Sequence, residues 1–332
     1  MRSWVVRRLT GSIVLACVIG RGGFLGSAVS VALSRRGIPE FVSGSTLAWP
    51  TRNDAVGIEQ FKFSLDIYLR ELLATQKCER IVVFWCAGRS FPRSNRLDVD
   101  LDQSLFELAM GSFFKYLSES QIHIIYSSSA GGIYSTSTNY LIGSDSKVSP
   151  RTPYGIMKLA AEQYLQEVSC QNVITSTIAR ISNIYGPGQD LAKAQGIISK
   201  LAVSGIRKVP IPIFVPLDTV RNYIYVDDAA EKLVRFAKEN FGISSIQMVT
   251  SPENLSLSSV IGTCNRVFHR RPLVVHCDLG IADQHSRSLA MRSSFDRNDR
   301  HTSFSHGLMK VWSDILRRSC TARAAMWEPI VD

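Results

Sequence analysis

The chain has 332 residues, a formal net charge of +10, 45% hydrophobic residues and 20% charged residues. This length allows one large domain or two closely associated ones, with room for a sizeable core. The composition excludes a disordered tail, a collagen-like fibre and a small disulfide scaffold. Apolar runs stay shorter than the roughly 18 residues that a membrane-spanning helix needs, so we expect no membrane insertion.

The distribution of Lys, Arg and Cys restricts the partners and the compartment. Basic residues are spread along the chain rather than gathered in blocks with aromatic residues. This spacing argues against nucleic acid as a partner and suits a phosphate-bearing small molecule. The seven cysteines are odd in number and form no C-x-x-C pair. We therefore expect reduced thiols and a cytoplasmic location.

The N-terminus superficially resembles an export signal, because Arg7 and Arg8 precede the apolar run 13–19. That run ends after seven residues at a glycine cluster, and an amphipathic segment follows at once. A signal peptide does not need such a cluster, and its removal would delete the most informative motif in the chain. We therefore expect residues 1–11 to be a short basic extension.

Apolar runs that predict strands alternate with a helical period. Between the first two runs, apolar residues recur at helical spacing from Leu25 to Leu33, and Gly37 marks the end of that helix. Several runs are continuously apolar, as expected for strands covered on both faces. The pattern predicts an α/β fold with a Rossmann-like doubly wound parallel sheet. The strand candidates are residues 13–19, 39–43, 81–86, 122–127, 173–179 and 222–226.

The regular alternation loosens after about Gly186, where prolines interrupt it. We therefore expect a dinucleotide-binding Rossmann domain over residues 12–185. Residues 186–332 should mainly form a smaller C-terminal substrate-binding lobe, with 220–240 returning to the first domain.

The first motif is Gly20-x-x-Gly23-x-x-Gly26, between the first predicted strand and the first predicted helix. In this context the first glycine permits a tight turn, the second allows backbone to approach a pyrophosphate, and the third allows close helix–strand packing. The N-terminus of the helix offers free N–H groups and a positive dipole end to phosphate. Glycine-rich turns also occur without a ligand, but this context favours a nucleotide.

The second constellation is Ser129, Tyr154 and Lys158. Tyr154 and Lys158 are four residues apart in a helical segment, so both side chains lie on one face. A nearby ammonium favours the phenolate and lowers the tyrosine pKa, which makes proton exchange with an alcohol feasible. Ser129 ends the fourth predicted strand, where such sheets place ligand contacts. Taken alone, a Tyr and a Lys one turn apart are more often an ordinary exposed helix face.

In combination, these motifs resemble the extended short-chain dehydrogenase/reductases, and more closely their nucleotide-sugar epimerase/dehydratase branch. Further matching segments occur in order along the chain and extend the resemblance from about residue 12 to residue 240. They are Trp85-Cys86-Ala87-Gly88, the segment from Arg180 through Asn183 to Gln189, Gln195-Gly196-Ile-Ile, and the segment from Val220 and Arg221 to Asp227 and Asp228.

The resemblance implies a role for each matching position. Tyr154 is implied as the acid/base, Lys158 as the residue that holds the nicotinamide ribose and lowers the Tyr154 pKa, and Ser129 as a hydrogen-bond partner of the reacting sugar oxygen. Asn183 and Arg221 are implied as contacts of the substrate's nucleotide diphosphate. Taken alone, they are an ordinary turn residue and a surface charge. The implied cofactor contacts are Gly20, Arg21, Gly23, Phe24, Leu25, Gly26, Ala87, Gly88, Tyr154 and Lys158.

Within the branch, the residues after Ser129 separate the possible reactions. Dehydratases of this family carry an Asp-Glu pair there, whereas this chain has Ala130 and Gly131. The run resembles that of UDP-hexose 4-epimerases, which implies transient hydride transfer from sugar C4 to bound NAD. A keto-nucleotide-sugar reductase that consumes NADPH would use the same residues. A catalytically idle dinucleotide-binding sensor or scaffold is the alternative from another class.

The choice between NAD and NADP stays open in the sequence. The second predicted strand does not end in the carboxylate that would bind the ribose hydroxyls of NAD, since residues 43–45 read Ser-Gly-Ser. Arg21 lies within the glycine turn, where a positive charge would suit a 2′-phosphate. We expect NAD as cofactor, with NADP possible.

The remaining expectations concern metals and partners. The six histidines lack ligand spacing with carboxylates or thiols, so we expect no metal site. The resemblance implies a nucleotide-diphosphate sugar as substrate, a role in polysaccharide biosynthesis, and a homodimer formed through the helix that carries Tyr154.

Overall fold

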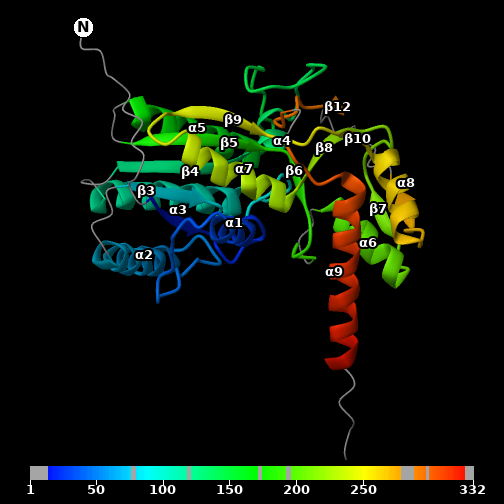
Figure 1. Cartoon of the computed structure of the whole chain (residues 1–332), viewed down its shortest axis with the longest axis horizontal. Helices are drawn as coiled ribbons and strands as arrows, with labels where there is room; N and C mark the ends of the chain where they lie inside the picture. Colours follow the sequence, from blue (N-terminus) through cyan, green and yellow to red (C-terminus); the bar gives the residue numbers. More distant parts are fainter. Residues whose placement is uncertain are drawn as a thin grey trace, which may run out of the picture.

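The computed structural model describes residues 14–75, 80–117, 121–170, 174–191, 196–277, 288–296 and 299–325. Figure 1 shows a central sheet with its flanking helices and, to the right of it, a smaller lobe. The predicted residues 1–11, Gln195 and part of the strand candidate 173–179 lie outside the described residues. No helix in these ranges is both long and apolar enough to cross a membrane.

The central sheet has six strands in the order β2-β1-β3-β4-β5-β9, and each neighbouring pair is parallel. The chain passes from β1 to β2 on one side and then to β3 on the other side of β1. The strand order therefore reverses between β1 and β3, and ligands of such sheets bind outside the carboxyl ends at this point. The strands are β1 (Val14–Ile19), β2 (Glu40–Phe41), β3 (Arg80–Trp85), β4 (Gln121–Ser129), β5 (Thr175–Ile181) and β9 (Ser245–Val249).

Helices cover both faces of this sheet, which confirms the predicted doubly wound parallel fold. On one face, α1 (Phe24–Arg35) and α7 (Val226–Glu239) pack together over the strands. On the other face lie α2 (Ala55–Thr75), α3 (Arg96–Tyr116) and α5 (Pro153–Cys170). The strands are continuously apolar because both of their faces are buried.

β4, β5 and β8 (Val220–Tyr225) differ from their predicted bounds by up to two residues, and β2 and β9 differ more. β2 has two residues instead of the five predicted, because it lies at the edge of the sheet and pairs only with β1. β9, at the opposite edge, was not predicted. Its sequence Ser-Ile-Gln-Met-Val alternates polar and apolar residues, as an edge strand does, and such a short alternation is a weak signal.

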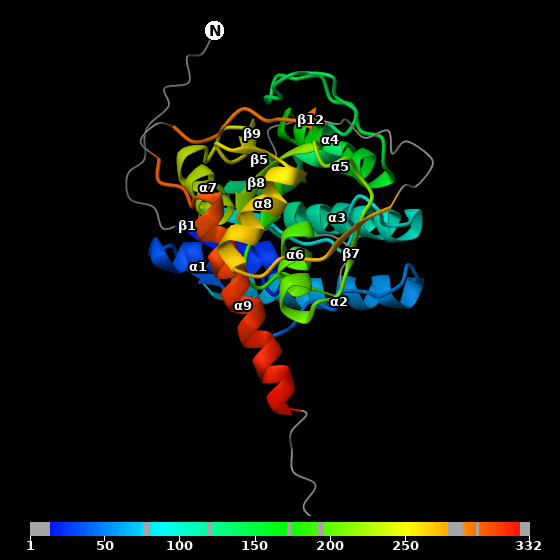
Figure 2. The same ribbon diagram turned by 90° about the vertical axis from the view of Figure 1, so that its right-hand side faces the viewer.

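The smaller lobe is built around β8 (Val220–Tyr225), which pairs with β6 (Asn183–Tyr185), β10 (Asn254–Ser256) and β12 (Ser288–Leu289). A separate pair joins β7 (Ile211–Ile213) to β11 (Val274–His276). Figure 2 shows this lobe facing the viewer, with the long α9 (Phe304–Ala325) extending below it. Its own apolar core includes residues of α6 (Ile197–Arg207), α8 (Leu257–Phe268) and α9.

The chain passes between the two parts at several points near the carboxyl edge of the sheet. β5 leads to β6 through Ser182 alone, and β8 leads directly into α7. Within residues 220–240, the strand thus belongs to the small sheet, whereas the helix packs on α1. These crossings place β6 and β8 beside the carboxyl ends of the central strands.

Candidate active site

The glycine turn after β1 is shaped by backbone contacts. Gly20 has φ +89°, a conformation that side chains disfavour, and a Cβ there would lie 2.8 Å from the Ala87 backbone nitrogen. The Gly23 amide donates to the Gly20 carbonyl at 2.9 Å. A Cβ on Gly26 would overlap that same carbonyl oxygen. Glycine is therefore required where the turn touches β3 and where α1 packs on the turn.

The N-terminus of α1 fits a phosphate group. Its N-cap is Gly23, which supplies no side-chain cap, and its first turn holds no acidic residue. The first N–H groups of a helix lack partners inside the helix and carry the positive end of its dipole. A Cβ at Gly22 would meet no atom within 4 Å, so the outer side of the turn is open. The predicted contacts Phe24 and Leu25 are the first two residues of this helix.

Arg21 does not lie unpaired in the turn. Its Nε donates to Glu40 Oε1 at 2.9 Å, and Ser30 Oγ donates to the same oxygen at 2.9 Å. The arginine side chain is 53% exposed, whereas that of Glu40 is 12% exposed. The second strand therefore does carry a carboxylate close to the glycine turn, although not at the position expected from the sequence.

The end of β3 adjoins the glycine turn, as its position next to β1 requires. The Cys86 amide donates to the Ile19 carbonyl at 2.9 Å, and Ala87 follows against Gly20. Gly88 has φ +130°, again a conformation for glycine. The predicted cofactor contacts from two separated segments thus form one continuous edge.

Ser129 and Tyr154 meet where β4 ends and α5 begins. Ser129 caps the short helix α4 (Ala130–Ile133), because its Oγ accepts the Gly132 amide at 3.2 Å. Gly155 packs so closely on this turn that a Cβ there would overlap the Gly132 carbonyl oxygen. The Tyr154 ring lies against the same turn, because a Cβ on Gly132 would be only 3.2 Å from its Cε1 atom. Two glycines therefore hold the start of α5 against the end of β4.

Lys158 lies one turn further along α5. Its Nζ is 5.8 Å from the centre of the Tyr154 ring and donates to the Ser127 carbonyl at 2.9 Å. Only 9% of the residue is exposed. The structure therefore brings the three predicted residues of this set, Ser129, Tyr154 and Lys158, together.

Burial dominates the pKa values of Tyr154 and Lys158. It raises the pKa of Tyr154 above the usual tyrosine value, the polar interaction with the Ser129 side chain opposes this rise, and the charge of Asp102 adds to it. Burial lowers the pKa of Lys158 to about 8. The effect of Lys158 on the pKa of Tyr154 stays a prediction.

A buried ion pair beneath this set was missed in the sequence. Arg180 on β5 binds Glu162 on α5 through Nη2 at 2.6 Å and Nε at 3.1 Å. Ser128 donates to the same carboxylate, and Tyr134 is bonded to Arg180. The side chains of the ion pair are at most 5% exposed. This network fixes α5 relative to β4 and β5, and its only sequence signal is a charged residue within an apolar strand.

The two predicted substrate contacts lie on paired strands. Asn183 on β6 is exposed, and its Oδ1 lies 3.8 Å from the position of a Cβ on Gly131, so it adjoins the turn after Ser129. Arg221 on β8 is half-buried and donates through Nη1 to the Val220 carbonyl at 2.7 Å. Asn183 is paired with Tyr223, which is two residues from Arg221 on the same strand. Both residues therefore lie in the part of the smaller lobe that adjoins the carboxyl edge of the sheet.

Metal ligation has no candidate in the described ranges, where no three His, Cys, Asp or Glu side chains gather as a metal site requires. His123, for example, lies between two threonines, with its ring nitrogens 2.8 Å from Thr175 Oγ1 and 3.1 Å from Thr177 Oγ1.

A Rossmann-like sheet with a glycine turn and an adjacent Ser–Tyr–Lys set defines the class of extended short-chain dehydrogenase/reductases. Residues 16–247 match the NAD dependent epimerase/dehydratase family. The chain belongs to this family, and a nicotinamide dinucleotide is its cofactor.

Relatives of both reaction types resemble this chain. The dTDP-4-dehydro-6-deoxyglucose reductase of Escherichia coli is 27% identical over 268 residues, which cover 77% of this chain and 83% of the reductase. The UDP-glucose 4-epimerase of Mycolicibacterium smegmatis is 28% identical over 118 residues, which cover 34% of this chain and 36% of the epimerase.

Solved structures share the fold. The UDP-glucose 4-epimerase of Thermotoga maritima with UDP-glucose superposes with a TM-score of 0.74 at 18% identity, covering 92% of this chain and 99% of that one. RMD from Pseudomonas aeruginosa complexed with NADPH superposes with a TM-score of 0.70 at 18% identity, covering 90% of this chain and 98% of that one.

Proposed function

We propose that this chain is a nucleotide-sugar 4-epimerase that acts on a hexose linked to a nucleoside diphosphate. The observation that carries the proposal is the assembly of Ser129, Tyr154 and Lys158 next to the glycine turn. Tyr154 lies against the turn that Ser129 caps, and Lys158 follows one helical turn later. A phenol, a hydroxyl and an ammonium in this order suit proton exchange with a sugar hydroxyl.

The chain's own residues hold the substrate and move its proton. Tyr154, as phenolate, takes the proton of the C4 hydroxyl, while Ser129 donates a hydrogen bond to the same oxygen. A nicotinamide dinucleotide held at the glycine turn would supply a reversible acceptor for the C4 hydride, so that the hydride could return to the opposite face of the 4-keto sugar. Tyr154 then gives the proton back to the C4 oxygen, so that protons and electrons balance over one cycle. Lys158 stabilises the phenolate by its charge.

The contacts that we assign to the nucleotide diphosphate come from two paired strands of the smaller lobe, β6 and β8. Arg221 offers a guanidinium that binds phosphate through two parallel N–H groups, and Asn183 offers an amide beside the Ser129 turn. We assign the pyrophosphate of the cofactor to Gly20, Gly23 and Gly26 and the first residues of α1.

Dehydration has no support at this site. Ala130, which follows Ser129, is fully buried, and the first turn of α4 holds no acidic residue. Elimination of water from the sugar would need a general acid and a general base at this place, which Ala130 and Gly131 do not supply.

An NADPH-dependent reductase of a keto-nucleotide sugar is the second candidate. It is favoured by the similarity to the E. coli reductase, which extends over 83% of that protein. Arg21 is 53% exposed and could turn from Glu40 to a 2′-phosphate. The reductase would use the same acid, Tyr154, but would release an oxidised cofactor after each turnover.

The first experiment is to denature the purified protein and identify the released nucleotide by chromatography. Stoichiometric NAD supports the epimerase, which regenerates its cofactor and can retain it. No released nucleotide, followed by tighter binding of NADPH than NADH, favours the reductase. Affinity for neither dinucleotide contradicts both proposals and leaves a scaffold without cofactor.

Turnover then separates the reactions directly. The protein is incubated with UDP-glucose and UDP-galactose, with dTDP-linked hexoses, and with a 4-keto sugar nucleotide plus NADPH. Interconversion of C4 epimers without net consumption of dinucleotide is expected. Loss of NADPH absorbance with the keto sugar alone would establish the reductase instead.

We also propose a homodimer in which α5 lies at the interface. Ile156, the third residue after the N-terminal Pro153 of that helix, is 55% exposed. Sedimentation of the purified protein at micromolar concentration tests this, and a single monomeric species would contradict it.

A further inference from the structure

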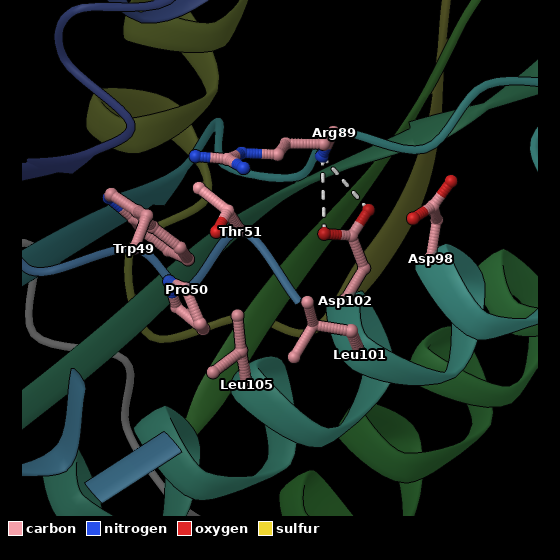
Figure 3. A pocket seen from close by; sticks show the side chains of 8 residues that line it. All are labelled: Trp49, Pro50, Thr51, Arg89, Asp98, Leu101, Asp102 and Leu105. Carbon is pink, nitrogen blue, oxygen red and sulfur yellow. Dashed lines mark hydrogen bonds between the residues drawn. The ribbon is translucent and has the colours of Figure 1, made fainter. Parts of the chain in front are cut away.

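Asp102 is an acidic residue near the Tyr154 set that the proposed reaction does not use. It lies on α3, and its carboxylate accepts the Arg89 amide at 2.9 and 3.1 Å and the Ser90 amide at 2.7 Å. Figure 3 shows the carboxylate directed from the helix to the Arg89 backbone, on one side of a small pocket that Trp49 closes on the other. The carboxylate is therefore bonded to backbone in the turn that follows β3.

The turn after β3 adjoins Ala87 and Gly88, which are predicted to contact the cofactor. Gly88 precedes Arg89, and a Cβ on Gly88 would lie 3.3 Å from Asp102 Oδ2. Two adjacent amides on one carboxylate are charge-assisted hydrogen bonds, which are stronger than neutral ones. Asp102 thus determines where Gly88 and its neighbours lie relative to the glycine turn.

The charge of Asp102 also reaches the proton-carrying residues. It favours the protonated forms of both Tyr154 and Lys158. Glu162 acts in the same direction on Lys158, but its carboxylate is already paired with Arg180. The hydrogen bonds of Asp102 go to neutral backbone amides.

Other titratable groups face the same site from each neighbouring element. From the end of β3, Cys86 lies 3.6 Å from Ser127 Oγ, and burial raises the pKa of its thiol to about 12. From β4, the Tyr126 ring lies 4.9 Å from Lys158 Nζ, and burial raises the pKa of Tyr126 well above its usual value. Since these raised values keep both groups neutral at ordinary pH, Asp102 and Glu162 supply the negative charge at Lys158.

We propose that Asp102 is a positioning residue for the dinucleotide site: its carboxylate holds the Gly88–Ser90 turn beside the predicted cofactor contacts and supplies negative charge near the Tyr154–Lys158 pair. The catalytic consequence rests on the proposed function, whereas the consequence for dinucleotide binding does not. Binding experiments therefore test it even if no sugar nucleotide is turned over.

Two substitutions separate the two effects. Asp102→Asn keeps a hydrogen-bond acceptor of the same shape and removes the charge, and Asp102→Ala removes both. Asp98 provides the matched control, because it lies one turn earlier on the same helix and lines the same pocket. Its backbone carbonyl, and not its carboxylate, accepts the Ser90 hydroxyl at 3.1 Å. Asp98→Asn and Asp98→Ala therefore make the same chemical changes at a carboxylate that does not bind the Arg89 and Ser90 amides.

The readout is the dissociation constant of NADH, or of NADPH if that nucleotide is released on denaturation, measured by fluorescence titration between pH 6 and 10. In the unaltered protein, binding should weaken as Lys158 loses its proton. In Asp102→Asn the midpoint of this weakening should move about one pH unit lower, with near-normal affinity at pH 6.5. In Asp102→Ala the affinity at pH 6.5 should also fall roughly tenfold, because the turn loses both amide contacts.

Each outcome decides the proposal. An unchanged midpoint in Asp102→Asn overturns the charge role, and unchanged affinity in Asp102→Ala overturns the positioning role. Equal effects of the Asp98 variants overturn both roles. If Asp102→Ala does not fold, the midpoint in Asp102→Asn still decides the charge role. Asp102→Leu, which keeps the side-chain volume and removes both acceptor oxygens, then decides the positioning role by its affinity at pH 6.5. Where turnover is measurable, both limbs of the kcat/KM profile should move to lower pH in Asp102→Asn.

Discussion

The glycine turn and the start of α5 lie at the same carboxyl edge of the sheet, and they are built differently. The turn spans residues 20–26, and its close contacts join backbone to backbone. The start of α5 instead depends on Ser129 from β4, on glycines from two helices, and on the buried pair of Glu162 and Arg180. The turn is thus defined by backbone contacts within residues 20–26 and with the end of β3, whereas the second site requires side chains and glycines from β4, α4, α5 and β5.

This difference indicates how each site should respond to substitution. A backbone-built turn is sensitive to any added atom at its contact points and insensitive elsewhere. A site built from side chains should lose activity when Ser129, Tyr154 or Lys158 is changed. It should lose stability when the buried Glu162–Arg180 pair is changed. Five substitutions or titrations test this contrast, from the largest expected effect to the smallest.

Tyr154→Phe removes the proton-carrying oxygen and leaves the ring in place. Turnover should fall by roughly 10²–10⁴-fold, since this is the usual contribution of a general acid/base. NADH affinity should stay within about twofold, because the ring and the glycine turn are unchanged. Tyr164→Phe, on the same helix, is the control and should retain activity. Comparable activity in the two variants would contradict the role of Tyr154.

Glu162→Gln tests the buried ion pair between Glu162 and Arg180. It leaves Arg180 buried without its charge partner, so the free energy of unfolding should fall by about 3–5 kcal/mol. Asp66→Asn is the matched control, because Asp66 also pairs with an arginine, Arg70, at 2.7 Å, but its side chain is 35% exposed. Its effect should stay below about 1 kcal/mol. Chemical denaturation measures both, and equal losses would show that the buried network has no special role.

Gly26→Ala and Gly22→Ala compare two positions of the same turn. A methyl group on Gly26 would overlap the Gly20 carbonyl oxygen, whereas one on Gly22 would meet no atom within 4 Å. Gly26→Ala should therefore cost about 3 kcal/mol of stability and weaken NADH binding at least tenfold. Gly22→Ala should change neither. Equal behaviour of the two variants in thermal unfolding and titration would contradict the backbone-built turn.

His123 tests the same sheet away from both sites. Burial lowers the pKa of its imidazole to about 4, from an ordinary value near 6.5. The unfolded chain therefore binds more protons between these values, and stability should be fully present above pH 6.5 and be lost as pH falls towards 4. The loss should be about 2–3 kcal/mol. His123→Gln should flatten this dependence in denaturation curves, and His306→Gln, which changes an exposed histidine, should not.

Glu40→Gln is expected to have the smallest effect. It releases Arg21 from an ion pair in which the arginine is 53% exposed, so the energies involved are small. NADPH affinity should rise by up to about fivefold, while NADH affinity stays constant. Adding Arg21→Ala should cancel the gain. A gain that survives the second substitution would mean that Arg21 does not contact the 2′-phosphate.

Several elements could be predicted within one or two residues because their signals are local. β1 was expected at 13–19 and is observed at Val14–Ile19, and α1 begins at Phe24, one residue before the predicted helical period. Continuous apolar runs indicated strands covered on both faces, and this holds for β3 and β4. The spacing of apolar residues and the positions of glycines can be read within a short segment, without knowledge of its tertiary contacts.

Other features depended on partners far along the chain. Arg21 binds Glu40, 19 residues later, and Arg180 binds Glu162 across two elements. Lys158 donates to the Ser127 carbonyl, which no spacing within α5 reveals, and burial raises the pKa of Tyr154. Asp102 gave no signal at all, since an aspartate in a polar helix start is ordinary.

The sequence by itself determined the doubly wound sheet, the glycine turn and the three residues Ser129, Tyr154 and Lys158, because periodicity, required glycines and ordered motifs are properties of short segments. Only the tertiary structure decided which charges meet, how deeply each is buried and which carboxylate binds the turn after β3. The physical reason is that ionisation and hydrogen bonding depend on distance and solvent access, and packing sets both between segments that the sequence keeps apart.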